Sequence, residues 1–426
     1  MDLTRSASAE TTPGWRVLAI LLIAYIFNFL DRQIVGVLAV PIKADLGLSD
    51  EQLGLMGGTA FALFYTGLGI PIAWLADRRS RVTIIAVSVG IWSAFTALCG
   101  LAQNFWQLFL ARMGVGVGEA GGVAPSYSLI TDYFPPAQRG RALAIFSFGV
   151  PIGSSLALFT GGWIATYVDW RAAFIAVGLA GLLVVPLVKL GIRDPIRGGL
   201  DRAPGAAAHV APPVAVALRR IAATPSFWLL SIGSASGSIM GYGLFFWTPS
   251  LFNRSFDLSL IEASMFYGSI VLAGGLVGIW FGGWLGDRAG SGNPGGYARV
   301  PAICFLLAAP ALGLGLFAPS LPVAWLMFLV PTILSLAWLG PVLAAIQHIV
   351  PPAMRAMASA SFLFINNLIG IGFGTWFLGK MSDEMRDRYG EDSLLYSILL
   401  GLGFYFLASL LYWLASRRLP RDWHRL

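Results

Sequence analysis

The chain has 426 residues, of which 57% are hydrophobic and only 12% are charged. Soluble domains carry about 25% charged residues, so this composition excludes an ordinary soluble protein and predicts a membrane protein with many spans. The net charge of +7 does not indicate a nucleic-acid partner, because the basic residues fall at the ends of apolar runs and not on one soluble face. We expect a monomer surrounded by the lipid bilayer.

Hydropathy predicts twelve membrane spans, taken in chain order at residues 17–42, 52–75, 82–102, 105–131, 140–166, 171–190, 226–250, 261–286, 299–318, 322–350, 354–379 and 393–415. A polar segment rich in Ala, Pro and Arg separates the sixth span from the seventh. The predicted fold is therefore all-α, with two pseudo-symmetric six-helix bundles. The first bundle occupies residues 1–192, a cytoplasmic linker occupies 193–225, and the second bundle occupies 226–426.

The distribution of charge predicts the orientation. Most of the 28 lysines and arginines fall in the two termini and in the loops that share their side, and the acidic residues favour the opposite side. Under the positive-inside rule both termini are cytoplasmic. We expect the protein in the cell membrane, which is the inner membrane in a Gram-negative bacterium.

Away from the ends of the predicted spans, four charged residues fall within the membrane, and all four belong to the first bundle. Asp31 and Arg32 lie near the middle of the first span, and Arg112 and Glu119 lie in the fourth. Such residues cost roughly 2.5–3.5 kcal/mol each on insertion scales, and they usually face a bundle interior or a wet cavity on a substrate or ion path. Asn28 shares the helix face of the first pair. The alternative is a self-satisfied structural pair that only orients the helix.

The spacing of Arg112 and Glu119 predicts that each needs a partner on another helix. Seven residues separate them, which is about 10 Å along a helix axis, too far for a bridge within the helix. A carboxyl group in a partly dry cavity retains its proton, whereas a nearby arginine favours the charged form. We therefore predict proton coupling by Asp31 and Glu119. The alternative is a static charge network that braces helices 1 and 4.

An anionic headgroup is the predicted ligand of the arginines. Their planar fork meets phosphate or carboxylate with two hydrogen bonds, so we assign substrate binding to Arg32 and Arg112 together with Asn28. The second bundle offers no charge away from the ends of its spans, and there we expect substrate contacts from Tyr242, Trp247 and Asn366. A charged surface facing an aromatic one suits an amphipathic substrate. The alternative for the helix 7 aromatics is ordinary packing.

Two unrelated motifs occur once in each half at nearly the same offset, as a duplicated six-helix unit requires. Trp74-Leu-Ala-Asp77-Arg78 follows the second span, and Trp284-Leu-Gly-Asp287-Arg288 follows the eighth. Pro-Pro-Ala-x-Arg precedes the fifth span and the eleventh, and it ends at Arg139 and Arg355.

At these motifs the chain resembles the major facilitator superfamily over nearly its whole length. The loop after the second span is similar to the family's Gly-x-Leu-Ala-Asp-Arg-x-Gly-Arg motif, although Ala73 and Ser80 replace glycines there. The resemblance implies that this motif holds the cytoplasmic side closed, and it assigns gating to Asp77, Arg78, Arg81, Asp287, Arg288, Arg139 and Arg355. The alternative is a basic loop that only sets topology. The family's antiporter signature in helix 5 is not matched.

Within the superfamily the chain is most similar to the spinster lipid transporters. The shared stretches are Asn28-Phe-Leu-Asp31-Arg32, Gly116-Val-Gly-Glu119-Ala120, the segment from Pro125 to Asp132, and Arg139-Gly-Arg with Pro151-Ile-Gly153. The resemblance implies a secondary transporter of a sphingolipid-like or lysophospholipid-like substrate, working by alternating access and coupled to protons. The alternative is a symporter of small organic anions with the same fold, because such proteins have a similar Asn-x-x-Asp-Arg helix.

Other functional classes find little support. Gly116-Val-Gly118-Glu-Ala-Gly121 fits a dinucleotide fingerprint but lies within a span and follows no strand. We find no ATP-binding motif, and His209, His348 and His424 are too scattered to form a metal cluster, so we expect neither a cofactor nor a metal. A membrane enzyme using Asp31 and Glu119 as acid and base is the remaining alternative, and the duplicated halves favour a carrier over it.

Overall fold

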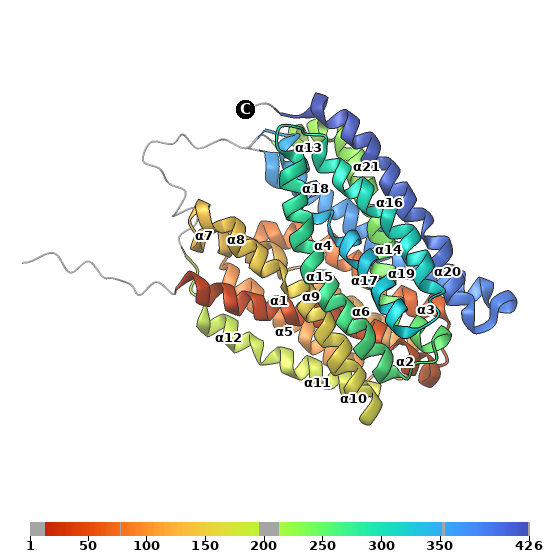
Figure 1. The fold of residues 1–426 in the computed structure, drawn as a ribbon. Coiled ribbons are helices and arrows are strands. Elements are labelled where there is room, and N and C mark those ends of the chain that lie inside the picture. Colours follow the sequence, from red (N-terminus) through yellow and green to blue (C-terminus); the bar gives the residue numbers. More distant parts are fainter. Residues whose placement is uncertain (1–12, 77, 196–212, 352–353, 425–426) are drawn as a thin grey trace, which may run out of the picture.

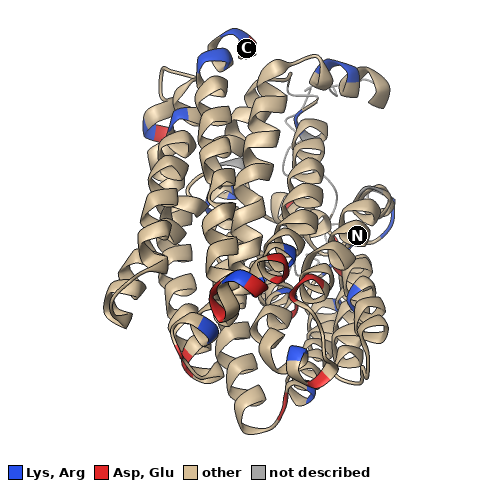
Figure 2. Ribbon diagram, turned by 90° about the vertical axis from the view of Figure 1, so that its right-hand side faces the viewer, with Lys and Arg blue, Asp and Glu red and all other residues tan. Residues whose placement is uncertain are grey.

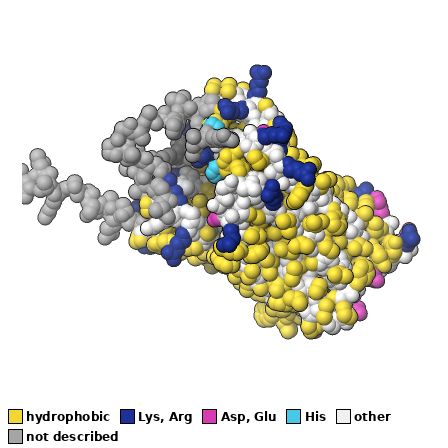
Figure 3. All heavy atoms as spheres, turned by 45° about the horizontal axis from the view of Figure 1, so that its top comes forward, with side chains coloured by type: hydrophobic (Ala, Val, Ile, Leu, Met, Phe, Trp, Pro, Cys, Tyr) yellow, Lys and Arg dark blue, Asp and Glu magenta, His cyan; other side chains and the backbone are white. Residues whose placement is uncertain are grey.

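The computed structural model describes residues 13–76, 78–195, 213–351 and 354–424, and every regular element in these ranges is helical (Figure 1). The helices form two bundles of six spans, as the sequence predicts. Charged residues are sparse along the middle of the helices, where hydrophobic side chains cover the flank of the molecule (Figures 2 and 3). This surface suits a protein surrounded by lipid.

The first bundle runs from residue 14 to residue 191, and most of its spans contain a break. Its six spans are built, in order, from α1 (Gly14–Val37) with α2 (Ala39–Leu46); α3 (Asp50–Gly54), the π-helical segment η1 (Leu55–Thr59) and α4 (Ala60–Ala76); α5 (Arg81–Cys99); α6 (Phe105–Glu119) with α7 (Val123–Tyr133); α8 (Pro136–Ser147), α9 (Gly149–Leu156), the π-helical segment η2 (Ala157–Gly161) and α10 (Gly162–Tyr167); and α11 (Trp170–Leu182) with α12 (Val184–Gly191).

The second bundle has longer unbroken helices. After α13 (Val214–Ala222), its spans are α14 (Pro225–Ser255); α15 (Leu260–Gly290); α16 (Gly296–Leu316); α17 (Leu321–Leu336) with α18 (Leu339–His348); α19 (Arg355–Tyr389); and, after the 3-10 turn η4 (Gly390–Asp392), α20 (Ser393–Gly401) with α21 (Gly403–Asp422). Helix α13 lies inside the predicted linker. Its apolar Ala217 and Ile221 are buried, so this part of the linker is an ordered amphipathic helix.

Length and apolarity alone mark 10 stretches of the described residues as able to cross a membrane. The last of them, Met357–Asp422, contains two spans joined at η4, and the broken fourth span adds another. With these two corrections the described chain crosses twelve times, as the sequence predicts. Below, helix 1 to helix 12 denote these twelve spans in chain order, and the labels with α denote the individual helical elements. We call the end that carries the starts of α1 and α14 the inner end, in the sense of the charge distribution, and the opposite end the outer end.

Helix starts follow ordinary capping chemistry. Ser49 and Ser259 each accept a hydrogen bond from the backbone three residues on, while Gln52 and Glu262 return a bond to the cap, forming two capping boxes. Asn104 caps α6, and Asp169 caps α11. These caps lie at the outer end of the helices, where the four residues fix the start of the second, eighth, fourth and sixth spans.

The bundles meet at their outer ends and diverge toward the inner end. In Figure 1, α3 lies beside α19 at the lower right, whereas α7 and α8 lie at the left and α13 and α18 lie at the top. Both π-helical segments belong to spans that pack on the other bundle, since η1 contacts α19 and η2 contacts α15. A π-turn inserts one residue into the helical register and often marks a functional site.

Candidate functional site

The four charges within the spans are buried and lie together in the first bundle. Asp31, Arg112 and Glu119 are fully buried, and Arg32 is 7% exposed. The Nη2 atom of Arg32 donates a hydrogen bond of 2.7 Å to Oε2 of Glu119, and Nε donates a second one of 3.2 Å to the same oxygen. Helix 1 therefore supplies the partner that Glu119 of helix 4 requires.

The other arginine, Arg112, binds the backbone of helix 1. Nη1 of Arg112 donates a 3.1 Å hydrogen bond to the carbonyl oxygen of Asp31. The carboxylate of Asp31 faces the charges of Arg112 and Glu119 and the hydroxyl of Thr96, yet neither carboxylate oxygen has a hydrogen-bond partner among the described residues. Arg32 and Arg112 thus each bond to the opposite helix. Asp31 remains the less well satisfied of the two acids.

Glycines in helix 4 make this arrangement possible. A Cβ atom on Gly116 would lie 2.6 Å from the carbonyl oxygen of Phe61, and one on Gly118 would lie 2.4 Å from the backbone nitrogen of Trp92. Any larger residue would push α6 away from α4 and α5. The Gly-Val-Gly-Glu sequence therefore places Glu119 directly beside these close contacts, three residues after Gly116 and next to Gly118.

Aromatic rings surround the Arg32 guanidinium. Its Cζ atom lies 4.8 Å from the ring centroid of Phe29, 4.7 Å from that of Phe61 and 4.8 Å from that of Tyr65. Each such contact is worth about 0.5–2 kcal/mol, depending on how far the site is desolvated. Arg32 is thus held both by Glu119 and by an aromatic cage.

Four tyrosines from four spans lie next to this cage. Tyr25, Tyr65, Tyr127 and Tyr242 lie near one another, and Tyr242 of the second bundle lies near Arg32. All four side chains are partly exposed. Sequence reasoning identified Tyr242 and missed the other three, because tyrosines in apolar spans carry no signal of their own.

Asn28 lies beside this group. It lines a small internal cavity of about 10 Å³ with Tyr25, Trp92 and Ser126. Its amide faces Glu119, and neither polar atom of the amide has a hydrogen-bond partner among the described residues. The structure therefore brings Asn28 together with the four predicted charges.

The three predicted substrate contacts of the second bundle do not lie in one place. Only Tyr242 approaches the charges. Nε1 of Trp247 donates a 2.8 Å hydrogen bond to the carbonyl oxygen of Thr375, and the ring is fully buried between α14 and α19. Asn366 accepts a 2.8 Å hydrogen bond from Ser238 across the same two helices. Trp247 and Asn366 thus join helices 7 and 11 within the second bundle.

The predicted gating residues of the paired loops make contacts within their own bundle. Arg78 stacks on Trp74, with Cζ at 3.9 Å from the ring centroid, and Arg288 lies over Trp284 at 5.9 Å. The same i, i+4 pair occurs in each half, which shows the repeat in three dimensions. Asp287 is exposed. Asp77 lies outside the described residues.

Arg139 and Arg355 have matching roles at the starts of helices 5 and 11. Nε of Arg139 donates a 3.0 Å hydrogen bond to the carbonyl oxygen of Phe134, and Nε of Arg355 donates one of 3.2 Å to that of Gln347. Each carbonyl lies at the end of the preceding span, where a helix leaves acceptors unpaired and favours positive charge. The repeated Pro-Pro-Ala-x-Arg motif thus fixes the turn between two spans.

Arg81 is buried and clamps the inner end of the first bundle. Its guanidinium donates to Asp194 at 3.0 Å, to Ser128 at 2.8 Å and to Asp132. These partners come from the end of helix 6 and from helix 4. The described contacts of Arg81 therefore hold three helices of one bundle in register.

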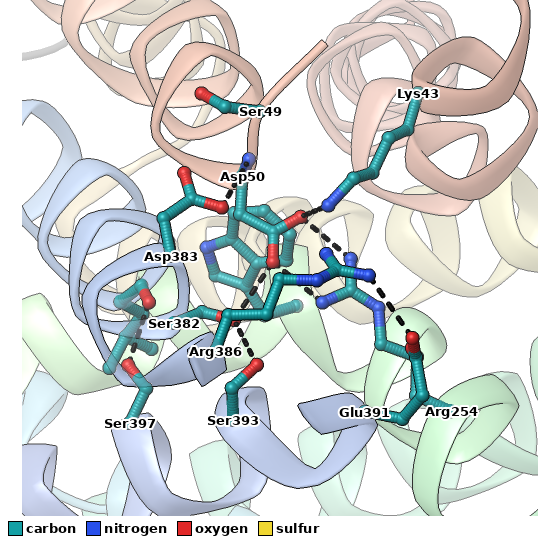
Figure 4. A network of polar contacts seen from close by, with 12 residues as sticks. Lys43, Ser49, Asp50, Arg254, Ser382, Asp383, Arg386, Glu391, Ser393 and Ser397 are labelled. Carbon is teal, nitrogen blue, oxygen red and sulfur yellow. Dashed lines mark hydrogen bonds and ion pairs between the residues drawn. The ribbon is translucent and has the colours of Figure 1, made fainter. Parts of the chain in front are cut away.

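The outer end contains a second charge cluster, centred on Asp50 (Figure 4). The fully buried Asp50 carboxylate accepts two hydrogen bonds from Arg254, of 2.6 and 2.7 Å, one of 2.5 Å from Lys43 and one of 2.8 Å from Ser382. In return, Asp383 accepts from the backbone nitrogens of Asp50 and Glu51 at 3.1 and 2.7 Å. The cluster joins helices 1 and 2 to helices 7 and 11.

Uncharged contacts extend this junction inward along helix 2. Thr375 donates a 2.8 Å hydrogen bond to the carbonyl oxygen of Gly54, and Thr59 donates one of 2.6 Å to that of Gly372. A Cβ atom on Gly58 would lie 2.3 Å from the carbonyl oxygen of Ile371. These hydrogen bonds, together with the contacts of Asp50 and Glu51, join the two bundles at the outer end.

Comparison with known proteins agrees with this architecture. Residues 21–375 match the family described as Major Facilitator Superfamily. The chain is 32% identical over 410 residues to an MFS-type efflux pump of Mycolicibacterium smegmatis, covering 96% of this chain and 94% of that protein. It is 28% identical over 403 residues to Protein spinster homolog 1 of Homo sapiens, covering 89% of this chain and 75% of that protein.

Solved structures give the same result. A bacterial homolog of the human lysosomal transporter spinster, in an inward-facing and unoccupied conformation, has a TM-score of 0.87 at 33% identity and covers 98% of this chain and 100% of that one. A D-xylose-proton symporter, at 14% identity and a TM-score of 0.72, covers 94% of this chain and 97% of that one, and it shows the fold alone. The chain belongs to the major facilitator superfamily, and it is an integral membrane transporter related to the spinster proteins.

Proposed function

We propose that this protein is a proton-coupled secondary transporter that moves an amphipathic, lipid-like substrate of sphingolipid or lysophospholipid type by alternating access. The observation that carries the proposal is the unequal composition of the two bundles around Arg32. All six buried charged residues of the described chain lie in the first bundle. Four of them, Asp31, Arg32, Arg112 and Glu119, form the group around Arg32, whereas Asp50 lies at the outer end and Arg81 at the inner end. The second bundle faces Arg32 with the aromatic Tyr242. An anionic headgroup fits the first surface, and an apolar tail fits the second.

Proton coupling follows from the competition for Arg32. While Glu119 is charged, its Oε2 atom occupies both donors that Arg32 offers it. A proton on Glu119 removes this charge and leaves the guanidinium available to a phosphate or carboxylate of the substrate. Asp31 is the second proton acceptor, because its carboxylate has no hydrogen-bond donor among the described residues. The related spinster proteins support a lipid-like substrate, as the sequence resemblance implies.

We assign the described conformation to the inward-facing state, with both termini in the cytoplasm. The closed outer junction supports this assignment, and so does the likeness to a spinster homolog in an inward-facing conformation. Small organic anions are the second candidate substrates, because two buried arginines would bind them equally well. The aromatic surface that Tyr25, Tyr65 and Tyr127 add favours the amphipathic substrate.

Transport in proteoliposomes tests the proposal. We expect uptake of lysophospholipids or a sphingoid phosphate that increases with an imposed pH gradient, and little uptake of short organic anions. Asp31→Asn and Glu119→Gln should each flatten the pH response, and the double variant should abolish proton-driven transport. Arg112→Ala should weaken substrate binding by releasing the backbone of Asp31.

Asp45→Asn is the matched control, because it removes an exposed outer carboxylate that pairs with Arg171 at 2.6 Å and lies outside the cavity. It should transport like the wild type. Normal pH-dependent transport by the Asp31→Asn, Glu119→Gln double variant would refute the proton assignment. Preferential uptake of organic anions would refute the lipid-like substrate.

A further inference from the structure

A groove between helices 2 and 11 opens on the lipid-facing side of the molecule. Its volume of about 450 Å³ lies within the range of pockets that hold one small molecule. The walls are apolar and consist of Leu55, Ala62 and Leu63 from helix 2 and Leu368, Ile369 and Phe373 from helix 11. Leu63 is 59% exposed and Leu368 is 37% exposed, so the groove faces the surrounding lipid.

The floor of the groove separates it from the charges around Arg32. Thr59 and Gly372, which are joined by a 2.6 Å hydrogen bond, both line the groove. Ala62 is buried, and a Cβ atom on Gly372 would already be in contact with it at 3.4 Å. The two helices therefore touch beneath the groove. It is a site on the flank of the transporter and no part of the passage between the bundles.

The outer end of the groove leads to a small charged cluster. Trp376 lines the groove and donates a 2.9 Å hydrogen bond to Glu51. One turn farther out, Nζ of Lys380 lies 3.5 Å from Oε1 of Glu51 and 3.9 Å from Oε1 of Glu384. All three charged side chains are at least one-third exposed, so these pairs are loose and accessible. Trp376 and Lys380 lie where tryptophan and lysine anchor spans at a membrane interface.

We propose that this groove binds one phospholipid of the outer leaflet, with an acyl chain along its walls and an ethanolamine headgroup at Lys380, Glu51 and Glu384. One ammonium between two carboxylates leaves an excess of negative charge, which attracts the ammonium of the headgroup while Lys380 receives its phosphate. A primary ammonium donates three hydrogen bonds, whereas a choline headgroup donates none. An anionic headgroup such as phosphatidylglycerol meets net repulsion.

The occupant would also favour the closed outer junction. The groove exists because Gly54, Thr59, Gly372 and Thr375 hold helices 2 and 11 together along one line. When these helices separate, the walls part and the site is lost. A ligand that binds only one of two states shifts the population toward that state. The bound lipid therefore stabilises the conformation described here, independently of the transported substrate.

Native mass spectrometry of the full chain tests the site. The purified protein receives equal amounts of phosphatidylethanolamine, phosphatidylcholine and phosphatidylglycerol, and the lipid retained after activation is measured. We expect one phosphatidylethanolamine to be retained several-fold more than either other lipid. Leu368→Trp should fill the groove and abolish this preference, whereas Leu110→Trp, at a 58% exposed position on α6 away from the groove, should preserve it.

The headgroup cluster has its own matched pair of variants. Lys380→Gln should reduce retention of phosphatidylethanolamine several-fold, whereas Arg386→Gln, which removes an outer cation of the same helix that pairs with Glu391 at 3.1 Å, should not. Equal retention of the three lipids by the wild type would overturn the proposal, as would unchanged retention in Leu368→Trp. An unchanged preference of Lys380→Gln for phosphatidylethanolamine would show that the cluster does not select the headgroup. None of these outcomes depends on the identity of the transported substrate.

Discussion

Helix 2 meets the second bundle in different ways along its length, and the contrast shows how this fold can close at one end and open at the other. At the outer end, Gly54 and Gly58 leave no room for even a Cβ atom against helix 11. Farther along the same helix, a Cβ atom on Gly67 or Gly69 would meet nothing within 4 Å. The same span thus carries a tight contact at its outer end and an open segment farther in, as expected of two bundles that rock about a common centre.

Among the described residues, the charged side chains show the same contrast, since they join the two bundles at the outer end but not at the inner end. Asp50 accepts hydrogen bonds across the bundles from Arg254 and Ser382, whereas Arg78, Arg288 and Arg355 at the inner end make their described contacts within their own bundle. The buried ion pair between the bundles exists only while the outer end is closed, and removal of one partner there leaves an uncompensated buried charge. We therefore expect the charge cluster around Asp50 to hold the outer end closed in the described state, and the following variants test this expectation.

Asp50→Asn should have the largest effect. It leaves the guanidinium of Arg254 without its charged partner in a buried place, and breaking such a pair costs about 3–5 kcal/mol. Opening the outer end restores water to the cation, so the population should move toward outward-open states. Double electron–electron resonance between labels at positions 101 and 317, on the outer ends of helices 3 and 9, should then show longer distances.

Asp45→Asn provides the control for that experiment. Asp45 pairs with Arg171 at 2.6 Å, but the side chains are 44% and 33% exposed, respectively, and both belong to the first bundle. The hydrogen bond from Arg171 lowers the pKa of Asp45, but water screens an exposed pair of this kind, so it contributes little to stability. Its loss should leave the label distances unchanged. Equal distances in Asp50→Asn and the wild type would show that the cluster does not hold the outer end closed.

Gly58→Val should have the next largest effect. The added carbon atoms collide with the backbone of Ile371, and overpacking of this kind typically costs about 1–3 kcal/mol. Separation of helices 2 and 11 relieves the collision, so the outer label distances should lengthen. Gly67→Val on the same helix has room for its side chain and should behave like the wild type. The prediction fails if both variants change the distances equally.

Thr59→Val should have the smallest effect. It removes the single hydrogen bond to Gly372 without changing the side-chain volume much, which costs about 0.5–1.5 kcal/mol. A modest increase in the outward-open fraction should appear by the same distance measurement. Thr66→Val is the control, since the hydroxyl of the buried Thr66 has no hydrogen-bond partner among the described residues. A larger effect of Thr66→Val would contradict the assignment of the junction to Thr59.

Much of the architecture could be predicted because apolar runs and repeated motifs are local signals. Asp31, Arg32, Arg112 and Glu119 stood out as charges in apolar runs, and the structure places all four in the first bundle. Their pairing was not accessible. The sequence predicted that Arg112 and Glu119 each need a partner on another helix, but it did not identify those partners. Arg32 of helix 1 bonds to Glu119 of helix 4, and Arg112 bonds to the backbone of helix 1.

The charge cluster around Asp50 was not predicted, for a different reason. The second predicted span begins at residue 52, the seventh ends at 250 and the eleventh ends at 379, but the helices begin at Asp50 and extend to Ser255 and Tyr389. Polar residues at helix ends lower the hydropathy, so the residues that latch the bundles were assigned to loops. The Ser49 capping box was a signal for the true start of helix 2. No local signal identifies Arg254 or Asp383 as partners across the bundles.

The ion pair between helices 1 and 4 also bears on how the protein is made. Arg32 and Glu119 are 87 residues apart, so the ribosome must synthesise that stretch before the pair can form. At roughly 5–20 residues per second, helix 1 waits about 4–17 s with an unmatched arginine and aspartate in its middle. Release of helix 1 into lipid during this interval costs roughly 2.5–3.5 kcal/mol for each unmatched charge. We therefore expect helix 1 to remain beside water or the insertion machinery until helix 4 arrives.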